Sequence, residues 1–315
     1  MLKKADSTAT IESTMDKSIT LQAPAKLNLH LDIFSKQDDG FHELQTIFVM
    51  IDLYDRLEVH FTEKPGCRVT GFQGVASRDN LIYRAYQLYA QKTGVRFGCE
   101  VACEKKIPQK AGLGGGSSDC AAMLRALNMK NRTENGEELD SSGLLSIASQ
   151  LGSDVPFFLI GPAAYAEGRG EKLEKIEMEH QYPVILVKPE IDISTRDAFT
   201  WFDDVSWVSR QHQSKEMILR NLLQNGPEKW PFFNSFTPIL IRRFPHLGDL
   251  MGRLKEAGAA YANMSGSGSA LFGVFTDEKS AKIARKTLKK VAKNVWKLKM
   301  LASPPEAVYN EARLE

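Results

Sequence analysis

The sequence predicts an α+β protein of two domains, and three patterns support this. Residues 19–34 alternate apolar and polar side chains, as a strand does. A glycine-rich loop at 112–116 separates a strand-like stretch from a run of good helix formers. A short apolar run at 184–187 is typical of a strand at the centre of another sheet. The expected division is a loose extension at 1–17, a first domain at 18–179 and a second domain at 180–315.

The composition is that of a globular protein without strong attraction to polyanions. The 315 residues are 43% hydrophobic and 25% charged. Because 41 basic and 39 acidic side chains nearly balance, we expect a small polar partner, with no nucleic acid and no membrane. No apolar run approaches the roughly 20 residues of a membrane helix, and the N-terminus resembles neither a signal nor a transit peptide. A cytoplasmic location is therefore expected.

The four cysteines are expected to be reduced, packed thiols. They lie at positions 67, 99, 103 and 120, form no C-x-x-C pair and lack histidines at zinc-finger spacing. Cys99 and Cys103 can share one face of a strand, but two further donors are missing nearby. We therefore expect no metal site at the cysteines.

The first strand has an unusual polar face. Its apolar face runs from Ala25 to Ile33, and the opposite face carries Lys26, Asn28, His30 and Asp32. A half-buried strand commonly turns such a face to solvent. However, Asn28 and His30 are short hydrogen-bonding groups that suit a cleft better than long flexible charges do. The face is therefore either solvated or one wall of a cleft.

Strands and helices then alternate up to the glycine loop. A turn at Asp39 and Gly40 precedes apolar-rich strands that continue to about residue 61. Apolar residues at helical spacing predict a helix that begins near residue 81 and ends at Gly94. Residues 97–108 predict another strand, so the loop joins a strand to a helix.

The glycine loop has the properties of a phosphate cradle. Glycines leave backbone N–H groups unobstructed, and the dipole of the following helix adds partial positive charge. The loop is not a P-loop, because Ser117 follows Gly116 where a lysine is required, and the third glycine of a dinucleotide fingerprint is also missing. A merely structural turn is the alternative. Ser117 or Ser118 is the expected helix cap.

The elements after this helix place a second glycine loop in the C-terminal half. A short helix closes at Gly152, and Asp154 then precedes an apolar segment that Pro156 begins and a small hairpin. Asp154 is therefore either a helix N-cap or a functional carboxylate. A Gly/Ser loop at 265–269 leads into an apolar strand. Residues 277–301 predict a basic helix and a strand, and without interleaved aromatics a solvated helix face is favoured over nucleic-acid binding.

Three stretches together resemble the ordered motifs of the GHMP kinases, a family named for galactokinase and the homoserine, mevalonate and phosphomevalonate kinases. They are PAKLNLHL (24–31), PQKAGLGGGSSDCAAML (108–124) and NMSGSGSALFGVF (263–275). The resemblance covers about residues 19–301. It implies a domain like the second domain of ribosomal protein S5, a ferredoxin-like C-terminal domain, and an active site in the cleft between them. It also implies ATP as phosphoryl donor and Mg²⁺ carried by ATP, with no protein ligand to the metal identified.

Further stretches are similar to those GHMP kinases whose small-molecule substrate contains a cytidine diphosphate group. They are DDGFHELQT (38–46), DNLIYRA (79–85) and LGSDVPFFL (151–159). This similarity implies transfer of the ATP γ-phosphoryl group to the 2-hydroxyl of 4-diphosphocytidyl-2-C-methyl-D-erythritol, in the non-mevalonate isoprenoid pathway, by a monomer or weak homodimer. A mevalonate- or homoserine-type kinase and a non-catalytic ATP- or RNA-binding module are the alternatives.

The resemblance also assigns roles to individual residues. Lys26 and Asp154 become the catalytic pair, with Asp154 as the base and Lys26 holding it ionised. A weak base suffices because the transition state of phosphoryl transfer is loose. The ATP phosphates are expected at Gly112, Gly114, Gly115, Gly116, Ser117, Ser118, Gly266, Ser267 and Gly268. The adenine is expected at Asn80, Leu81 and Lys105.

The acceptor substrate is expected at five residues, namely Asn28, Phe41, His42, Thr195 and Phe199. By the resemblance, His42 hydrogen-bonds the cytosine edge while Phe41 and Phe199 stack on its two faces. Phe41 stands where the family commonly has tyrosine, which keeps the ring face and loses a hydroxyl.

Overall fold

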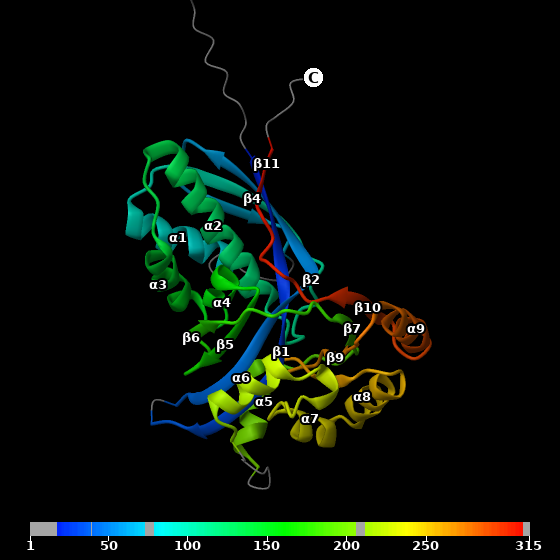
Figure 1. The fold of residues 1–315 in the computed structure, drawn as a ribbon. Coiled ribbons are helices and arrows are strands. Elements are labelled where there is room, and N and C mark those ends of the chain that lie inside the picture. Colours follow the sequence, from blue (N-terminus) through cyan, green and yellow to red (C-terminus); the bar gives the residue numbers. More distant parts are fainter. Residues whose placement is uncertain (1–17, 39, 73–78, 206–211, 311–315) are drawn as a thin grey trace, which may run out of the picture.

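A computed structural model of the protein describes residues 18–38, 40–72, 79–205 and 212–310. It has two lobes, each a sheet with helices packed on it (Figure 1). The first lobe holds the first sheet and helices α1 to α4, and the second lobe holds the second sheet and helices α5 to α9. The N-terminal extension at 1–17 lies outside the described residues.

The first sheet is built on two long antiparallel strands, β1 (Ser18–Lys36) and β2 (His42–Thr62). In the described part of the chain this sheet has seven strands, in the order β11-β1-β2-β4-β3, with β5 on β2 and β6 on β5. The other strands are β3 (Cys67–Thr70), β4 (Gly98–Glu104), β5 (Ala163–Glu167), β6 (Lys172–Lys175) and β11 (Val308–Asn310). β11 pairs with the start of β1 and was not predicted from the sequence.

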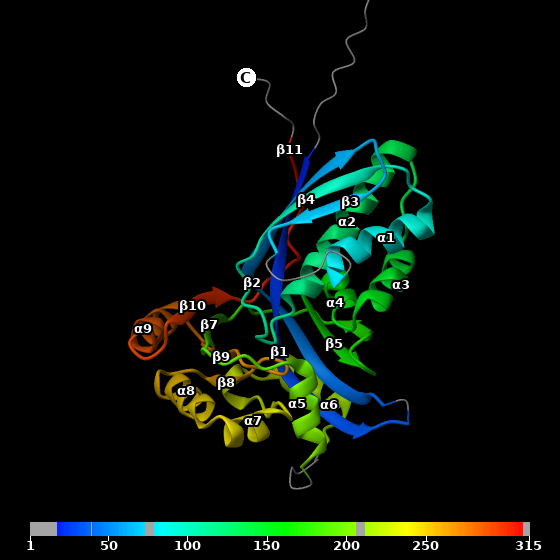
Figure 2. The ribbon, with the colours of Figure 1, turned by 180° about the vertical axis from the view of Figure 1, so that it is seen from behind.

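Four helices cover one face of the first sheet (Figures 1 and 2). They are α1 (Leu81–Thr93), α2 (Gly115–Asn135), α3 (Ser141–Leu151) and α4 (Val155–Ile160). The predicted helix near residue 81 is confirmed, because α1 ends at Gly94 in the left-handed conformation. The predicted serine cap of α2 is wrong: α2 begins at Gly115 after Gly114, so both serines lie inside its first turn. Buried side chains of α2 form the centre of this lobe's core.

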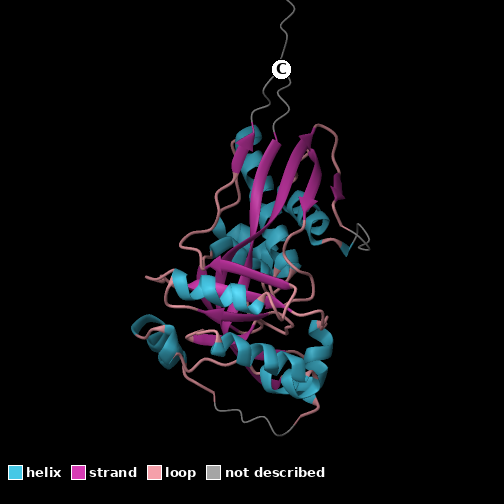
Figure 3. Ribbon diagram, turned by 90° about the vertical axis from the view of Figure 1, so that its right-hand side faces the viewer, coloured by secondary structure: helices cyan, strands magenta, loops and turns pink. Residues whose placement is uncertain are grey.

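The second sheet is antiparallel and, within the described residues, has four strands in the order β10-β7-β9-β8. Figure 3 shows its strands running across the direction of the first sheet. The strands are β7 (Pro183–Lys188), β8 (Tyr261–Met264), β9 (Leu271–Val274) and β10 (Asn294–Lys299). The helices are α5 (Thr195–Asp203), α6 (Lys215–Gln224), α7 (Thr237–Arg243), α8 (Pro245–Glu256) and α9 (Glu278–Leu288). β7 lies inside the sheet and is buried throughout, which confirms the prediction of a central strand.

From Ala23 to Ile33, β1 is buried on both faces, which corrects the expectation of a half-buried strand there. The side chains on its polar face are at most 4% exposed, from Lys26 to Asp32. Segments of the second lobe contact this face: the His30 ring centroid lies 4.7 Å from that of Phe233, and Asp32 Oδ2 lies 2.7 Å from His212 Nδ1. Burial accordingly lowers the pKa of His30 to about 4. The solvated-face interpretation is therefore excluded, and the strand lies at the junction of the two lobes.

Candidate active site

A pocket of about 140 Å³ opens at the junction of the two lobes. We call it the junction pocket. Its walls come from β1, β2, the two glycine loops, the start of α4 and α5, which are far apart in sequence. Its polar lining includes Lys26, Asn28, Thr46, Asp154, Arg169, Thr195 and Ser267. Five of the seven residues predicted for catalysis or acceptor binding, Phe199 among them, therefore line one pocket.

Lys26 is a buried cation that neighbouring groups hold in place. Two irregularities in the β1–β2 register bracket it, between Pro24 and Ala25 and between Asn28 and His30. Its backbone N–H donates to Leu113 O at 2.9 Å, which ties β1 to the first glycine loop. Its Nζ donates to Asn28 Oδ1 at 2.6 Å. A buried ammonium needs such partners, because an unpaired buried charge is very costly.

Asp154 is the acidic partner of Lys26. Asp154 Oδ2 lies 3.5 Å from Lys26 Nζ, and the Asp154 side chain is 32% exposed whereas that of Lys26 is 5% exposed. Asp154 occupies the N-cap position of α4, but its side chain makes no capping hydrogen bond. The carboxylate is therefore turned to the pocket, where it can accept a proton from a bound group.

Asn28 orients Lys26 through a chain of hydrogen bonds. Asn28 Nδ2 donates to Thr46 Oγ1 at 2.8 Å, and Thr46 Oγ1 donates to His30 O at 2.6 Å. The Thr46 hydroxyl proton is committed to that carbonyl, so Thr46 can only accept from Asn28, which leaves Asn28 Oδ1 facing Lys26. Sequence reasoning missed Thr46, although it ends the stretch 38–46.

The first glycine loop is both a packed turn and an open helix end. A Cβ at Gly112 would lie 2.0 Å from Ser265 O, and one at Gly114 would lie 3.0 Å from Lys26 Cγ. Both residues have positive φ, so packing and backbone conformation each require glycine. A Cβ at Gly116 would meet only Leu81, at 3.9 Å. The structural-turn interpretation therefore applies to Gly112 and Gly114, and the phosphate-cradle interpretation applies to Gly116.

The start of α2 fits a phosphate group. The first N–H groups of a helix have no intrahelical acceptor, and in α2 the ladder begins with Ser118 N–H donating to Gly114 O at 2.9 Å. The Ser118 hydroxyl is buried and has no hydrogen-bond partner among the described residues. The N–H groups of Gly115, Gly116 and Ser117 and this hydroxyl can together receive an anion.

The second glycine loop is fastened to the first. Ser265 Oγ donates to Gly112 O at 2.9 Å, and Ala270 N–H donates to Ala111 O at 3.2 Å. Ser267 Oγ lies 3.2 Å from Thr195 Oγ1, and with Gly266 it lines the junction pocket. Gly268 instead faces Met264, whose Sδ would be 2.7 Å from an added Cβ. Two of the three residues predicted in this loop therefore reach the pocket.

A second pocket of about 180 Å³ lies beside α1 and brings the predicted adenine residues together. We call it the α1 pocket. Asn80, Leu81 and Lys105 line it with Gly116, which connects it to the start of α2. Asn80 also caps α1, because its Oδ1 accepts from Ile82 N–H at 2.9 Å. Its remaining lining residues, Phe72, Asp79, Ile82, Gln109 and Asp119, were not predicted.

Lys105 is held between two buried carboxylates that sequence reasoning missed. Its Nζ pairs with Asp55 and, at 2.5 Å, with Asp119 Oδ2. Asp55 Oδ1 also accepts from the N–H groups of Lys106 and Ile107 at 2.6 and 2.8 Å. Burial raises the pKa of Asp119 to about 7, and Asp55 adds to this rise while Lys105 opposes it. The ammonium group of Lys105 is therefore paired with carboxylates of the protein itself, in the lining of the α1 pocket.

The residues predicted to hold cytosine lie around the end of α5. His42 is buried, stacks on Phe199 with a centroid distance of 5.0 Å, and places Nε2 2.7 Å from Asp203 Oδ1. Phe41 is 53% exposed, and the guanidinium of Arg169 lies 3.8 Å from its ring centroid. Phe199 lines the junction pocket, but neither Phe41 nor His42 is among the described residues that line this pocket. Asp203 and Arg169 were not predicted as partners of these residues.

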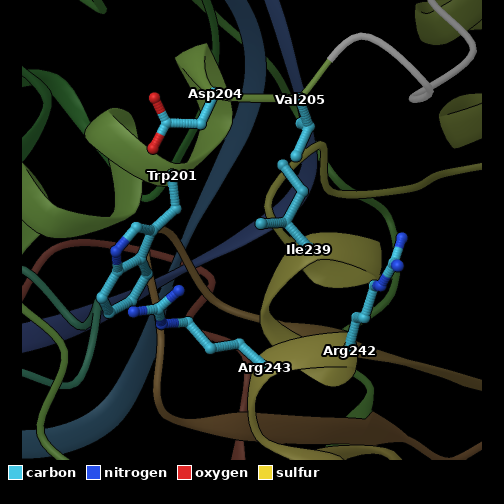
Figure 4. Close-up of a pocket in the computed structure, with 6 residues that line it drawn as sticks. All are labelled: Trp201, Asp204, Val205, Ile239, Arg242 and Arg243. Atoms are coloured by element: carbon cyan, nitrogen blue, oxygen red, sulfur yellow. The ribbon is translucent and has the colours of Figure 1, made fainter.

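A larger pocket lies on α5 and α7, and none of these residues lines it (Figure 4). It encloses about 500 Å³ and is lined by Trp201, Asp204, Val205, Ile239, Arg242 and Arg243. In it, the Arg243 guanidinium stacks on Trp201, 4.1 Å from the ring centroid. It contains none of the predicted site residues, so the chemistry points to the junction pocket despite its smaller volume.

The described residues contain no group of three or more His, Cys, Asp or Glu side chains that could hold a metal ion. No helix among them is long and apolar enough to cross a bilayer. The four cysteines are free thiols, and burial raises the pKa of Cys120, as expected for inert packed groups.

The chain matches two family models, one described as the GHMP kinases N terminal domain over residues 80–162 and the other as GHMP kinases C terminal over 213–294. A 4-diphosphocytidyl-2-C-methyl-D-erythritol kinase of Pelotomaculum thermopropionicum is 37% identical over 268 residues, which cover 84% of this chain and 91% of the relative. A kinase of the same name from Geobacter sp. (strain M21) is 37% identical over 87% of this chain and 95% of its own length.

Solved structures agree with these matches. The crystal structure of a 4-(cytidine 5'-diphospho)-2C-methyl-D-erythritol kinase has a TM-score of 0.75 at 35% identity and covers 89% of this chain and 98% of its own. A homoserine kinase from Cytophaga hutchinsonii has a TM-score of 0.72 at 20% identity, over 94% of this chain and 99% of its own, and supports the fold alone. The predicted two-domain fold is confirmed. The chain belongs to the GHMP kinases and, within them, to the family of 4-diphosphocytidyl-2-C-methyl-D-erythritol kinases.

Proposed function

We propose that the protein transfers the γ-phosphoryl group of ATP to the 2-hydroxyl of 4-diphosphocytidyl-2-C-methyl-D-erythritol, giving the 2-phosphate and ADP. The observation that carries the chemistry is the pairing of Lys26 with Asp154, 3.5 Å apart, in the lining of the junction pocket. The family to which the chain belongs supports this acceptor.

In this proposal Asp154 accepts the proton of the attacking hydroxyl. The hydroxyl oxygen forms a bond to the γ-phosphorus, the bond from that phosphorus to the β–γ bridging oxygen breaks, and the proton passes to the Asp154 carboxylate. Lys26 lies beside this carboxylate as its counter-charge, and Asn28 fixes the direction of the Lys26 ammonium group. Because the transition state is loose, the proton leaves late and an ordinary carboxylate is basic enough.

The nucleotide is proposed to lie across the α1 pocket with its phosphates at the start of α2. Gly116 lines the α1 pocket and also belongs to the first turn of α2, so one ligand can reach both. Bound ATP supplies the phosphoryl group, and Mg²⁺ carried on its phosphates neutralises charge. Mg²⁺ keeps several waters and needs few protein ligands, so the absence of a carboxylate cluster among the described residues is compatible with it.

The proposal is tested by ADP release from purified protein with Mg-ATP and a panel of acceptors, namely the cytidine diphosphate substrate, mevalonate and homoserine. Turnover is expected with the first acceptor, and ³¹P NMR should show a new phosphate ester at its 2-position. The Asp154→Asn variant, purified in the same way, controls for contaminating kinases. Turnover with mevalonate or homoserine alone would replace the proposal with a sister-kinase function. ATP binding without turnover on any acceptor would favour a non-catalytic module.

A further inference from the structure

We propose that Asp203 makes the acceptor site selective for cytosine. Asp203, the last residue of α5, fixes the proton of the neutral His42 ring on Nε2, which leaves Nδ1 to accept from the 4-amino group of the base. The inference rests on the proposed function, because it needs an acceptor that carries a cytosine. Neither the sequence motifs nor the family matches assign a role to Asp203.

The two hydrogen-bond partners of Asp203 come from the adjoining ends of β1 and β2. Asp203 Oδ1 lies 2.7 Å from His42 Nε2, and Asp203 Oδ2 accepts from Lys36 Nζ at 3.3 Å. Lys36 ends β1, His42 begins β2, and the two residues pair with each other. A carboxylate accepts hydrogen bonds and cannot donate them, so the proton of the contact with His42 lies on Nε2. The partner of one ring nitrogen thus sets the state of the other.

The His42 ring is held against one turn of α5. Its side chain is 5% exposed, stacks on Phe199 with a centroid distance of 5.0 Å, and meets Phe202 edge-on at 5.7 Å. Phe199 and Asp203 are four residues apart on α5, so they lie on the same side of this helix. The edge of the ring that carries Nε2 is therefore directed to the end of α5.

Nδ1 is the His42 ring nitrogen that remains for a ligand. Within the part of the chain that the structure describes, Nδ1 makes no hydrogen bond, and it is not one of the buried side-chain atoms that lack a partner. His30 differs in this respect, since its Nε2 is buried and unpaired. In a neutral ring with the proton on Nε2, Nδ1 accepts a hydrogen bond and cannot donate one.

An acceptor at this place distinguishes cytosine from uracil. Cytosine has an amino group at its 4-position, which donates, whereas the oxygen that uracil has there accepts. The amino group would satisfy Nδ1, but the oxygen would place two acceptors opposite each other without a donor. A proton on Nδ1 would reverse this preference. Asp203 is therefore a positioning residue, and His42 is the residue that contacts the base.

α5 also places this base subsite at a fixed distance from the catalytic pair. Thr195 begins the helix and lines the junction pocket, where its Oγ1 lies 3.2 Å from Ser267 Oγ. Phe199 lines the same pocket one turn further on, and Asp203 lies one more turn along, at His42. Eight residues of helix rise about 12 Å. This separation suits an acceptor whose base is remote from its reacting hydroxyl.

The test is the Asp203→Asn variant, in which Lys36 decides how the new amide is oriented. An ammonium group only donates, so the amide should turn its oxygen to Lys36 and its NH₂ group to His42 Nε2. Nε2 must then accept, and the proton moves to Nδ1. The ratio of kcat/KM for the cytidine diphosphate acceptor to kcat/KM for its uridine analogue should fall roughly 5- to 150-fold, the scale of a buried polar group left without its partner.

Two control variants separate this effect from a simple loss of charge. Asp204→Asn removes the neighbouring carboxylate, which lines the pocket on α5 and α7, and should leave the ratio unchanged. Adding Lys36→Met to Asp203→Asn lets the amide turn its oxygen to His42, so the ratio should rise again.

NMR of protein with ¹⁵N-labelled histidine observes the proton directly. The His42 signals are assigned by their loss in His42→Gln. At about pH 8, the wild type should have its proton on Nε2 and Asp203→Asn should have it on Nδ1. CDP should shift the Nδ1 signal of the wild type, and UDP should not.

The remaining outcomes distinguish this inference from the proposed function. An unchanged ratio in folded Asp203→Asn, a ratio that Lys36→Met does not restore, or a wild-type proton on Nδ1 would overturn the role of Asp203 and leave the proposed function intact. If the wild type does not phosphorylate the cytidine diphosphate acceptor, the proposed function falls, and the CDP and UDP spectra alone decide this inference. The same wild-type spectra decide it if Asp203→Asn does not fold.

Discussion

Replacing Gly116 with alanine should make the protein more stable and yet weaken its binding of ATP. Gly116 lies in the first turn of α2 with ordinary helical φ, and its added Cβ would meet only Leu81 Cδ1, at 3.9 Å. Alanine is favoured over glycine in a helix by about 0.5–1 kcal/mol, because glycine loses more backbone freedom on folding. The free energy of unfolding without ligand should therefore rise by up to this amount.

The same methyl group faces the α1 pocket, which Gly116 lines. If the nucleotide passes over this residue, the methyl fills space that the ligand needs, and overpacking of a tight site typically costs about 1–3 kcal/mol. Kd for ATP should therefore rise roughly 5- to 150-fold. Thermal unfolding without ligand measures the first effect, and isothermal titration with Mg-ATP measures the second.

Gly115→Ala is the matched control at the neighbouring position. Its Cβ would lie 3.1 Å from Ile107 Cγ2 and 3.3 Å from Asp55 Oδ2, so this variant should lose stability through crowding. A Gly116→Ala variant that is more stable and binds ATP as the wild type does would show that the nucleotide does not approach α2 at this residue.

Three further predictions concern the α1 pocket and the acceptor. The pKa of Asp119 is about 7 in the folded protein and ordinarily 3.8, so between pH 4 and pH 7 the folded protein keeps a proton on Asp119 that the unfolded chain has lost. The contribution of this protonated carboxyl group to the free energy of unfolding is therefore complete below about pH 4 and is lost as the pH rises through 7. Denaturant unfolding from pH 5 to 8 should show this loss in the wild type, and a wild-type slope in Asp119→Asn would contradict it. Phe41→Ala should raise KM for the cytidine substrate roughly 5- to 150-fold by loss of stacking, whereas Phe41→Tyr should change it little; steady-state kinetics that show equal effects would oppose this. The uridine analogue should have a much lower kcat/KM than the cytidine substrate if the cytosine edge is paired, and equal values would mean that the pocket does not read the base.

Local patterns were enough to predict the elements that carry the site. The alternation at 19–34 and the helical spacing near residue 81 correspond to β1 and α1, since both depend on which residues of one segment are apolar. The two glycine loops were placed correctly between strand and helix and before β9. Their mutual fastening through Ser265 and Gly112 was not predicted, because it joins residues 153 positions apart.

What the sequence could not supply is the set of contacts between distant segments. The polar face of β1 is buried because segments near His212 and Phe233 pack on it, and the alternation within β1 says nothing about those segments. The two carboxylates on Lys105 come from β2 and α2, at 50 and 14 residues' separation. Arg169 had a local signal, namely an arginine between two glycines in a hairpin, but only the fold shows which pocket it enters.

The proposed mechanism depends most on Lys26 and Asp154 acting as one catalytic unit. The decisive measurement is kcat with the cytidine diphosphate acceptor for Lys26→Met, Asp154→Asn and the double variant, with folding checked by thermal unfolding. Each single change should lower kcat at least about 100-fold, the scale for loss of a general base or a preorganised charge. The double variant should be little worse than either single one, because removing one partner already disables the pair. Near-normal kcat in either folded single variant, or two effects that multiply fully, would contradict the assignment.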